Sequence, residues 1–333
     1  MKQPIVWIAF AASVGVMSWA SVRLVAALEG IGARLRLSEG LLGVVTALGA
    51  DAPEICSAVA ALLSGHGEVG VGVVLGSNIF NLAALLGVSA IVAGRVSIGR
   101  EGLWLNGGTS LAMSAIVLAL VLGWLAAGWS LLLTVLVLAP YVVVLALRPA
   151  QIAALPLPAR ARRFIDVAVG HAHRDARQRR LLRHPAWHDG AWLVVALALV
   201  VVASLGAVRS AVWLGDAWGV GHGVIGMLVL AALTSVPNVV AAVRLAREGR
   251  GAVVVSESLN SNTLNIVAGL CLPAVVLGFA PPTGTVVFAV FWLLAMKLVA
   301  LGAASHRDGL RRGGGIVLVA LYLVFAAVIV ARG

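Results

Sequence analysis

The sequence predicts an all-α, polytopic membrane protein of about ten transmembrane helices, arranged as two inverted-topology repeats of five helices. Three observations support this fold class. Of 333 residues, 61% are apolar and only 11% are charged, whereas soluble domains average about 45–50% and about 25%. Apolar runs of membrane-spanning length recur throughout the chain. Finally, one pair of polar motifs occurs twice, with five spans between the equivalent copies.

The expected helices follow from the apolar runs, since a helix needs about 20 apolar residues to cross the hydrocarbon core. The first run follows Lys2 and could imitate a secretory signal. It continues as far as Leu28, which is too long for a signal h-region of about 7–15 residues, so we expect an uncleaved span. In chain order, the expected spans are 4–28, 38–63, 68–93, 103–123, 127–147, 190–213, 222–246, 251–278, 283–303 and 314–331.

These spans divide the chain into three regions. Residues 1–147 and 190–333 form two membrane regions of five spans each, and residues 148–189 form a basic loop between them. The loop arginines lie in alternate connections, so by the positive-inside rule these connections are cytoplasmic and both termini are external. We expect a monomeric, multi-pass protein of the cell membrane whose Arg148–Arg183 loop binds anionic lipid headgroups. The net charge of +11 then encodes orientation, and no nucleic-acid partner is expected.

Neither enzyme activity nor a resident cofactor is expected. The spans contain no His-rich metal motif and no pairing of a nucleophile with a base. The two cysteines lie in apolar runs and are expected to be small hydrophobic residues rather than disulfide or metal ligands. Four histidines cluster in the basic loop, where a solvated segment is the favoured interpretation and metal sensing the alternative. The cysteines are Cys56 and Cys271, and the histidines are His171, His173, His184 and His188.

The internal repeat relates positions 184 residues apart without a gap. Its first copy comprises Gly49–Glu54 and Gly76–Asn81, and its second comprises Leu233–Asn238 and Asn260–Asn265. Because an odd number of spans separates the copies, the second lies upside down in the membrane. Such repeats are typical of secondary transporters, whose binding site lies near the midplane where the repeats meet. The aligned pairs are Pro53 with Pro237, Gly65 with Gly249, Ser77 with Ser261, and Asn81 with Asn265.

Each copy places a proline in the middle of a span, at Pro53 and at Pro237. Proline removes a backbone donor and frees a carbonyl one turn earlier, and irregular backbone at membrane depth is tolerated where it lines a cavity. The next helix carries Ser and Asn four residues apart, which places a hydroxyl and an amide on one face. With Glu54 and Asn238 after the prolines, the set is rich in oxygen and suits hard cations such as calcium, which takes about 6–8 oxygen ligands.

Carboxylates inside the spans strengthen this interpretation. Glu54 lies mid-span, where insertion scales give a free-energy cost of at least about 2.5–3.5 kcal/mol for placing a carboxylate in the membrane. It is therefore a functional candidate by default. Asp51 lies one turn before Glu54, and Glu257 one turn before Ser261. The basic residues within the spans lie near span ends or can extend to the interface. An ion pair between Arg244 and one of these acids is left open. It is also left open that the neutral polar residues only form hydrogen bonds between helices. These bases are Arg23, Arg209, Arg244 and Lys297.

At these motifs the sequence resembles the calcium/cation antiporter superfamily, the sodium/calcium exchangers and their prokaryotic relatives. That family reads approximately G-T-S-x-P-E on one helix of each repeat and G-N-x-x-G-S-N-x-x-N on the next. Here the first repeat reads G-A-D-A-P-E from Gly49 and G-V-V-L-G-S-N-I-F-N from Gly72. The second reads L-T-S-V-P-N from Leu233 and S-E-S-L-N-S-N-T-L-N from Ser256. The resemblance covers nearly the whole chain and implies that 1–147 and 190–333 are two sodium/calcium exchanger membrane regions.

The resemblance implies a secondary antiporter that exchanges calcium for sodium or protons while the first and sixth helices slide across the site. The family usually has an acid at Asn238 and often one at Asn81 or Asn265, whereas here acids replace a Ser at Asp51 and an Asn at Glu257. The alternatives are monovalent cation/proton exchange and a transport-inactive structural or regulatory homologue. The residues implied to line the ion site are Glu54, Ser77, Asn81, Thr234, Ser235, Asn238, Ser261 and Asn265, with Asp51 and Glu257 as added candidate ligands.

Overall fold

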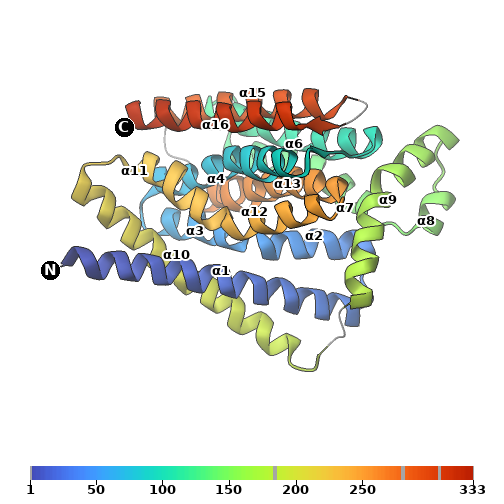
Figure 1. Cartoon of the computed structure of the whole chain (residues 1–333), viewed down its shortest axis with the longest axis horizontal. Coiled ribbons are helices and arrows are strands. Elements are labelled where there is room, and N and C mark those ends of the chain that lie inside the picture. The colour runs from blue at the N-terminus through green and yellow to red at the C-terminus, as the bar shows by residue number, and fades with distance from the viewer. Residues whose placement is uncertain (1, 183–185, 279–281, 307–308, 333) are drawn as a thin grey trace.

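The computed structural model describes residues 2–182, 186–278, 282–306 and 309–332, which form a helical bundle with one two-stranded sheet (Figure 1). Nine of the described helices are long and apolar enough to cross a membrane, and a bent helix pair makes a tenth. The predicted all-α polytopic fold is therefore confirmed. The nine are Gln3–Arg34, Gly67–Ala93, Arg100–Val121, Ala127–Ala146, Asp189–Trp218, His222–Arg247, Gly251–Leu277, Gly284–Ala304 and Arg312–Arg332, and the bent pair is Leu41–Ala50 with Ala52–Leu63.

The elements follow the two halves of the chain, and those named η are π-helical. The first half forms α1 (Lys2–Arg34), α2 (Glu39–Ala50), α3 (Ala52–Leu63), α4 (Gly67–Asn81), η1 (Leu82–Val88), α5 (Ser89–Ala93), β1 (Arg95–Val96), α6 (Arg100–Val121) and α7 (Ala127–Ala146). The connection forms α8 (Pro149–Ala154) and α9 (Ala159–Leu182). The second half forms α10 (Asp189–Trp218), α11 (His222–Val224), η2 (Ile225–Leu230), α12 (Ala231–Arg247), α13 (Gly251–Ile266), η3 (Val267–Cys271), α14 (Leu272–Leu277), α15 (Gly284–Ala304), β2 (Leu310–Arg311) and α16 (Arg312–Arg332).

Both termini lie at one end of the bundle, together with α11, and α8 and α9 lie at the opposite end (Figure 1). We call these ends the terminal face and the basic face. Ten spans would place both termini on one side of a membrane, and the shared end (Figure 1) agrees with that expectation. That the basic face is cytoplasmic stays a prediction of the positive-inside rule.

The connection between the halves is helical, so the expectation of a loop at 148–189 is wrong. Its Ala- and Arg-rich sequence favours helix, and it has apolar residues to bury. Ile152 of α8 and Val169 of α9 pack in one cluster with Tyr141 and Leu145 of α7. Of the four histidines predicted to cluster here, only the side chain of His188 is described, and it is exposed; the side chains of the other three lie outside the described residues.

The backbone repeats with the same offset as the sequence. Gly65 and Gly249, 184 residues apart, follow α3 and α12 with φ of +80° and +76°. Gly94 and Gly278 follow α5 and α14, each with φ of +83°. Glycine is favoured at such positions because a positive φ strains any residue with a Cβ atom. The repeat therefore extends from the polar motifs into the turns that end the helices.

The two prolines have different consequences. The chain bends by 55° between α2 and α3, at Asp51 and just before Pro53. In the second repeat α12 continues through Pro237, so the expected break at both prolines is found only in the first repeat. In the span of the second repeat that contains Pro237, the irregular hydrogen bonding lies instead in η2, directly before α12. π-helical turns of this kind are frequent at functional sites.

Helix α4 lies at the centre of the bundle, and its backbone touches η2. A Cβ atom added at Gly76 would lie 2.2 Å from the carbonyl oxygen of Met227, and one at Gly226 would lie 2.5 Å from that of Val69. Small residues permit such close helix packing in membranes. The two repeats are therefore in backbone contact toward the terminal face.

Helices α1 and α10 pack against each other along the edge of the bundle (Figure 1). Met17 and Leu24 of α1 bury against Ala196 and Val200 of α10. Arg23 of α1 is exposed, and its guanidinium lies over the rings of Trp19 and Trp192. Opposite this pair, β1 and β2 form an antiparallel sheet that joins α5 to α16.

Candidate functional site

Two buried carboxylates come from the break in the second span. Asp51 is the residue between α2 and α3, and Glu54 lies in the first turn of α3. Their exposed fractions are 2% and 1%. The N-terminus of a helix carries partial positive charge and unpaired N–H groups, which favours carboxylates there. The proline that breaks the helix thus also creates the place where two acids are tolerated.

The second repeat supplies the hydrogen-bond donors to these carboxylates. The hydroxyl of Ser235 donates to Oε1 of Glu54 at 2.9 Å, and that of Ser261 donates to Oδ1 of Asp51 at 2.8 Å. The amide Nδ2 of Asn238 lies 3.2 Å from Oδ1 of Asp51 and 3.4 Å from Oε1 of Glu54. The two inverted copies therefore meet at one pair of acids.

The same site contains oxygen atoms that have no donor. Oδ2 of Asp51, Oε2 of Glu54 and Oδ1 of Asn81 are buried without a hydrogen-bond partner among the described residues, and outside these contacts so are Oδ1 and Nδ2 of Asn265. Buried polar atoms are almost always paired, and each exception calls for an explanation. Unpaired carboxylate and amide oxygens are the ligands of hard cations. The donor set of this site therefore fits a cation as cargo.

The remaining predicted ligands differ in their contacts. Asn81 donates through Nδ2 to the hydroxyl of Ser261 at 3.0 Å, which joins it to the acid pair. The hydroxyls of Ser77 and Thr234 are buried but bond carbonyls of their own helices, Val74 at 3.1 Å and Leu230 at 2.9 Å. The structure thus joins Asp51, Glu54, Asn81, Ser235, Asn238 and Ser261 by direct contacts, and leaves Ser77, Thr234 and Asn265 buried without a direct contact to that set.

One carbonyl freed by Pro53 already has a partner. The hydroxyl of Ser21 on α1 lies 3.2 Å from the oxygen of Gly49 and 3.4 Å from that of Ala50. The prediction that freed carbonyls are open ligands therefore needs correction at Gly49, where one lone pair is used. Ser21 was not predicted, since a single serine in an apolar span carries no signal without its partner.

A cavity of about 250 Å³ begins beside the acid pair, at Ala50 and at Asn238, whose amide bonds both acids, but neither Asp51 nor Glu54 lines it. It reaches from Ala50 and Asn238 to Ala168 of α9 and lies between α2, α12 and α13. Glu257 lines this cavity. The third predicted acid therefore belongs to the cavity that leads to the pair.

A polar network that was not predicted lines the same cavity. The Tyr141 hydroxyl lies 2.7 Å from Oδ1 of Asn106 and also bonds the side chain of Asn260. Nδ2 of Asn106 donates to the hydroxyl of Ser256 at 3.4 Å. Asn106 is an amide inside a predicted span, and Asn260 stands where the first repeat has Gly76, so both positions carried a signal in the sequence.

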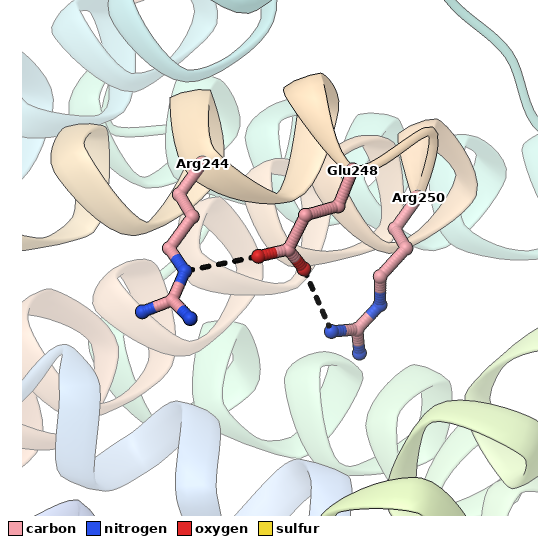
Figure 2. A network of polar contacts seen from close by, with 3 residues as sticks. All are labelled: Arg244, Glu248 and Arg250. Atoms are coloured by element: carbon pink, nitrogen blue, oxygen red, sulfur yellow. Dashed lines mark hydrogen bonds and ion pairs between the residues drawn. The ribbon is translucent and has the colours of Figure 1, made fainter.

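Within the described part of the chain, no ion pair joins the candidate bases to Asp51 or Glu54. Arg244 is exposed and bonds Oε1 of Glu248 at 2.9 Å, and Arg250 lies 3.5 Å from Oε2 of the same residue (Figure 2). The pair left open between Arg244 and a site acid is thus not found. Lys297, expected to extend to the interface, is fully buried instead, with its ammonium on the oxygen atoms of Ser110 and Ser114.

Two inverted repeats around a buried acidic pair define a polytopic membrane protein of the secondary-transporter class. The sequence profile of the family described as "Sodium/calcium exchanger protein" matches residues 5–148 and 188–331. The chain therefore belongs to the sodium/calcium exchanger family, within the calcium/cation antiporter superfamily that the motifs resemble. The two matched ranges overlap the expected membrane regions 1–147 and 190–333, except at residues 1–4 and 332–333.

Curated relatives carry names that agree with this assignment, and solved structures share the fold. The "Putative antiporter CaxA" of Alkalimonas amylolytica is 26% identical over 331 residues, covering 93% of this chain and 95% of that protein. "Sodium/potassium/calcium exchanger 2" of Gallus gallus is 33% identical over 122 residues, which cover 34% of this chain but only 19% of that relative's length. In fold, the chain is similar to an H+/Ca2+ exchanger, CAX, with a TM-score of 0.72 and 14% identity over 98% of this chain and 85% of that one. It is also similar to the sodium-calcium exchanger NCX_Mj, with a TM-score of 0.60 and 22% identity over 97% and 98% of the two chains.

Proposed function

We propose that this protein is a secondary active antiporter that exchanges Ca2+ for Na+ or H+ by alternating access at a midplane site of oxygen ligands. The observation that carries the proposal is the contact between Asp51 and Glu54 of one repeat and Ser235, Asn238 and Ser261 of the other. A site built from both repeats changes shape when the repeats move relative to each other. That property is what coupled exchange requires.

The charge of the site favours a divalent ion over a monovalent one. Asp51 and Glu54 together supply two negative charges, enough to neutralise Ca2+ without the acid that the family usually has at Asn238. Asn238 now contributes an amide that holds both carboxylates, as the 3.2 and 3.4 Å contacts indicate. The acid missing from the second repeat is thus replaced by one in the first. The names of the relatives and structural neighbours, which include Na+/Ca2+ and H+/Ca2+ exchangers, support the same ion.

The cavity gives the ion a path to one face. It runs from Ala50 and Asn238, next to the acid pair, to Ala168 of α9, while the backbone contact between α4 and η2 closes the opposite side. We propose that the structure shows the state open toward the basic face, and that this face is cytoplasmic. On α9, Arg160 and Arg163 are exposed beside Phe164, a combination of charge and aromatic surface that suits anionic headgroups at the membrane interface.

Transport into proteoliposomes tests the proposal. Vesicles loaded with Na+, or acidified inside, are expected to take up calcium-45 when diluted into Na+-free or neutral buffer. Glu54→Gln is expected to abolish uptake, because it removes a ligand charge at the site. Glu101→Gln makes the same change in the first turn of α6, outside the contacts of the site, and is expected to retain uptake.

The two gradients distinguish the alternatives. Uptake under only one gradient identifies the coupling ion. Rubidium or sodium exchange without calcium uptake would favour monovalent specificity, and absence of all fluxes would favour a transport-inactive homologue. Calcium uptake that survives Glu54→Gln would contradict the proposed site.

A further inference from the structure

Two histidines meet at the terminal face, away from the acid pair. His66 precedes α4, and His222 begins α11. Their ring centroids are 5.6 Å apart, with an angle of 72° between the ring planes. The residues come from different repeats and from turns that are distant in sequence. The antiport mechanism proposed above assigns them no role.

The backbone holds both histidines in place. His66 ends a capped turn in which its N–H bonds the carbonyl of Ala61 at 2.9 Å after Gly65. The turn before His222 closes in the same way, with the N–H of Val220 on the carbonyl of Gly215 at 2.9 Å. These bonds follow the Schellman pattern of helix C-termini. The rings are therefore presented from rigid turns rather than from free loops.

A carboxylate orients one of the rings. Nε2 of His222 lies 2.8 Å from Oδ1 of Asp216, the last acidic residue of α10. A carboxylate on one ring nitrogen fixes the proton there and leaves the other nitrogen with its lone pair, an arrangement that recurs behind histidine ligands of metals. In His66 it is Nδ1 that is buried without a hydrogen-bond partner among the described residues.

The ring separation matches two imidazoles on one metal ion. An imidazole nitrogen binds Zn2+ at about 2.0–2.1 Å, which places the ion about 3.2 Å from the ring centroid. Two such rings at a tetrahedral angle have centroids about 5.2 Å apart. The observed distance between the ring centroids is 5.6 Å, and a small rotation of either side chain would close the difference from this value.

We propose that His66 and His222 bind a transition-metal ion of the Zn2+ class at the terminal face, with Asp216 as the positioning residue and water completing the coordination. The described residues contain no ready cluster of three His, Cys, Asp or Glu side chains, so the site binds more weakly than a four-ligand structural zinc site. Imidazole selects Zn2+, Cu2+ or Ni2+, whereas the acid pair selects harder ions. The histidine site and the acid pair are therefore expected to bind different classes of metal ion.

The bound ion would link parts of the protein that must separate for the terminal face to open. His66 lies in the turn between α3 and α4, and His222 lies just after α10. Occupancy of the site would hold these turns together and slow exchange from that face. This consequence rests on the proposed function, whereas metal binding itself does not.

Calorimetry with full-length protein in lipid nanodiscs tests the binding. The background is a variant with the four histidines of 148–189 replaced by Ala, which leaves His66, His222 and His306. Zn2+ is expected to bind and to raise the unfolding temperature, whereas Mg2+ does not. His66→Ala and His222→Ala are each expected to weaken Zn2+ binding at least tenfold, while His306→Ala, at the basic face, changes nothing.

Asp216 is tested separately as a positioning residue. Asp216→Asn is expected to weaken Zn2+ binding by about 10–100-fold, the usual effect of removing such a partner. The metal-free unfolding temperature should stay unchanged, and Asp216→Glu should restore part of the affinity. Unchanged Zn2+ affinity in the His66→Ala/His222→Ala double variant would overturn the proposal.

X-ray absorption of the Zn2+-loaded background protein needs no further variant. Two imidazole ligands are expected, and none or one overturns the proposal. In proteoliposomes, Zn2+ on the terminal face should slow calcium exchange unless both histidines are replaced. Zn2+ binding without any calcium flux would contradict the proposed function but leave the metal site established.

Discussion

Asn78 and Asn262 hydrogen-bond to each other reciprocally: Nδ2 of each donates to the main-chain carbonyl of the other, both at 3.2 Å. The two residues are 184 positions apart, the offset of the sequence repeat. Equal contacts in both directions place the pseudo-twofold axis of the protein between them. Asn262 directly follows Ser261, the donor to Asp51, so this contact is linked along α13 to the acid pair.

Because this contact is symmetric, removing either side chain is expected to lower the free energy of unfolding by the same amount. Asn78→Ala and Asn262→Ala should each lower the free energy of unfolding by about 1 kcal/mol, within the roughly 0.6–1.7 kcal/mol measured for helix–helix hydrogen bonds in membranes. Thermal unfolding in detergent measures this. Thr109→Ala is the control, because among the described residues that hydroxyl bonds its own helix, at the carbonyl of Leu105. A cost confined to one of the two asparagines would refute the symmetric contact.

Restoring the acid that the family usually has gives a second prediction. Asn238→Asp should lower stability without calcium, because it removes the amide that bonds Asp51 and Glu54 and adds a third charge. A hydrogen bond to a charged group contributes about 1.5–3 kcal/mol. With calcium, the rise in unfolding temperature should exceed that of the wild type. Asn238→Ala is the control, because it loses the amide without adding a ligand. If calcium raised the unfolding temperature of both variants equally, the added negative charge at this position would have no role in binding calcium.

The sequence predicted the acid pair well because its signals are local. Polar residues in apolar spans are costly, so Asp51 and Glu54 stood out, and the gapless offset showed which partners face them. The offset also aligned Gly65 with Gly249, and the structure shows that both have a positive φ, at turns that the sequence analysis did not predict. Nothing more than spacing was needed for these features.

Other features depend on contacts that spacing does not encode. Ser21 is recognised only once α1 lies over Gly49, and Tyr141 only once α7 meets Asn106 and Asn260. The π-helical segments η1 and η3 follow Asn81 and Asn265 in both repeats, yet no residue type marks them. The polar composition of 148–189 indicates a loop, because it masks the few apolar residues that α8 and α9 bury.

Access to the cavity predicts different reactivity at two equivalent positions. Val253 lines the cavity, whereas Val69, 184 residues earlier, is fully buried at the contact between α4 and η2. In a background with Cys56 and Cys271 replaced by Ala, Val253→Cys should react with a hydrophilic thiol reagent and Val69→Cys should not, since thiol reactivity requires exposure. Mass spectrometry of the labelled protein gives the comparison. Equal labelling would mean that both faces open in the resting state.

Close backbone contact makes Gly76 sensitive to a single methyl group. Gly76→Ala should lower stability by about 1–3 kcal/mol, the usual cost of overpacking, because the added Cβ would lie 2.2 Å from the Met227 carbonyl. Gly108→Ala is the matched control, since nothing lies within 4 Å of a Cβ there, and it should be neutral or stabilising. Faster labelling of Val69→Cys in the Gly76→Ala background would show that the contact also closes the terminal face. A Gly76→Ala protein as stable as the wild type would contradict the contact.

The buried ammonium of Lys297 gives the last prediction. Its Nζ lies 3.0 Å from the carbonyl of Ser110 and 2.8 and 2.6 Å from the hydroxyls of Ser110 and Ser114, with no carboxylate in ion-pair distance among the described residues. Burying a charge against neutral partners is costly, and replacing such a group by an apolar side chain of similar volume is often neutral or stabilising.

Lys297→Met should therefore keep or raise the unfolding temperature, because the Ser114 hydroxyl already bonds the Ser110 carbonyl of its own helix at 3.1 Å. Ser110→Ala should instead lower stability by about 1–3 kcal/mol, since it leaves the ammonium short of an acceptor. Ser110→Ala in the Lys297→Met background should cost much less, and this double-mutant comparison separates the two effects. A large loss of stability in Lys297→Met would show that the ammonium has a stabilising partner beyond the two serines.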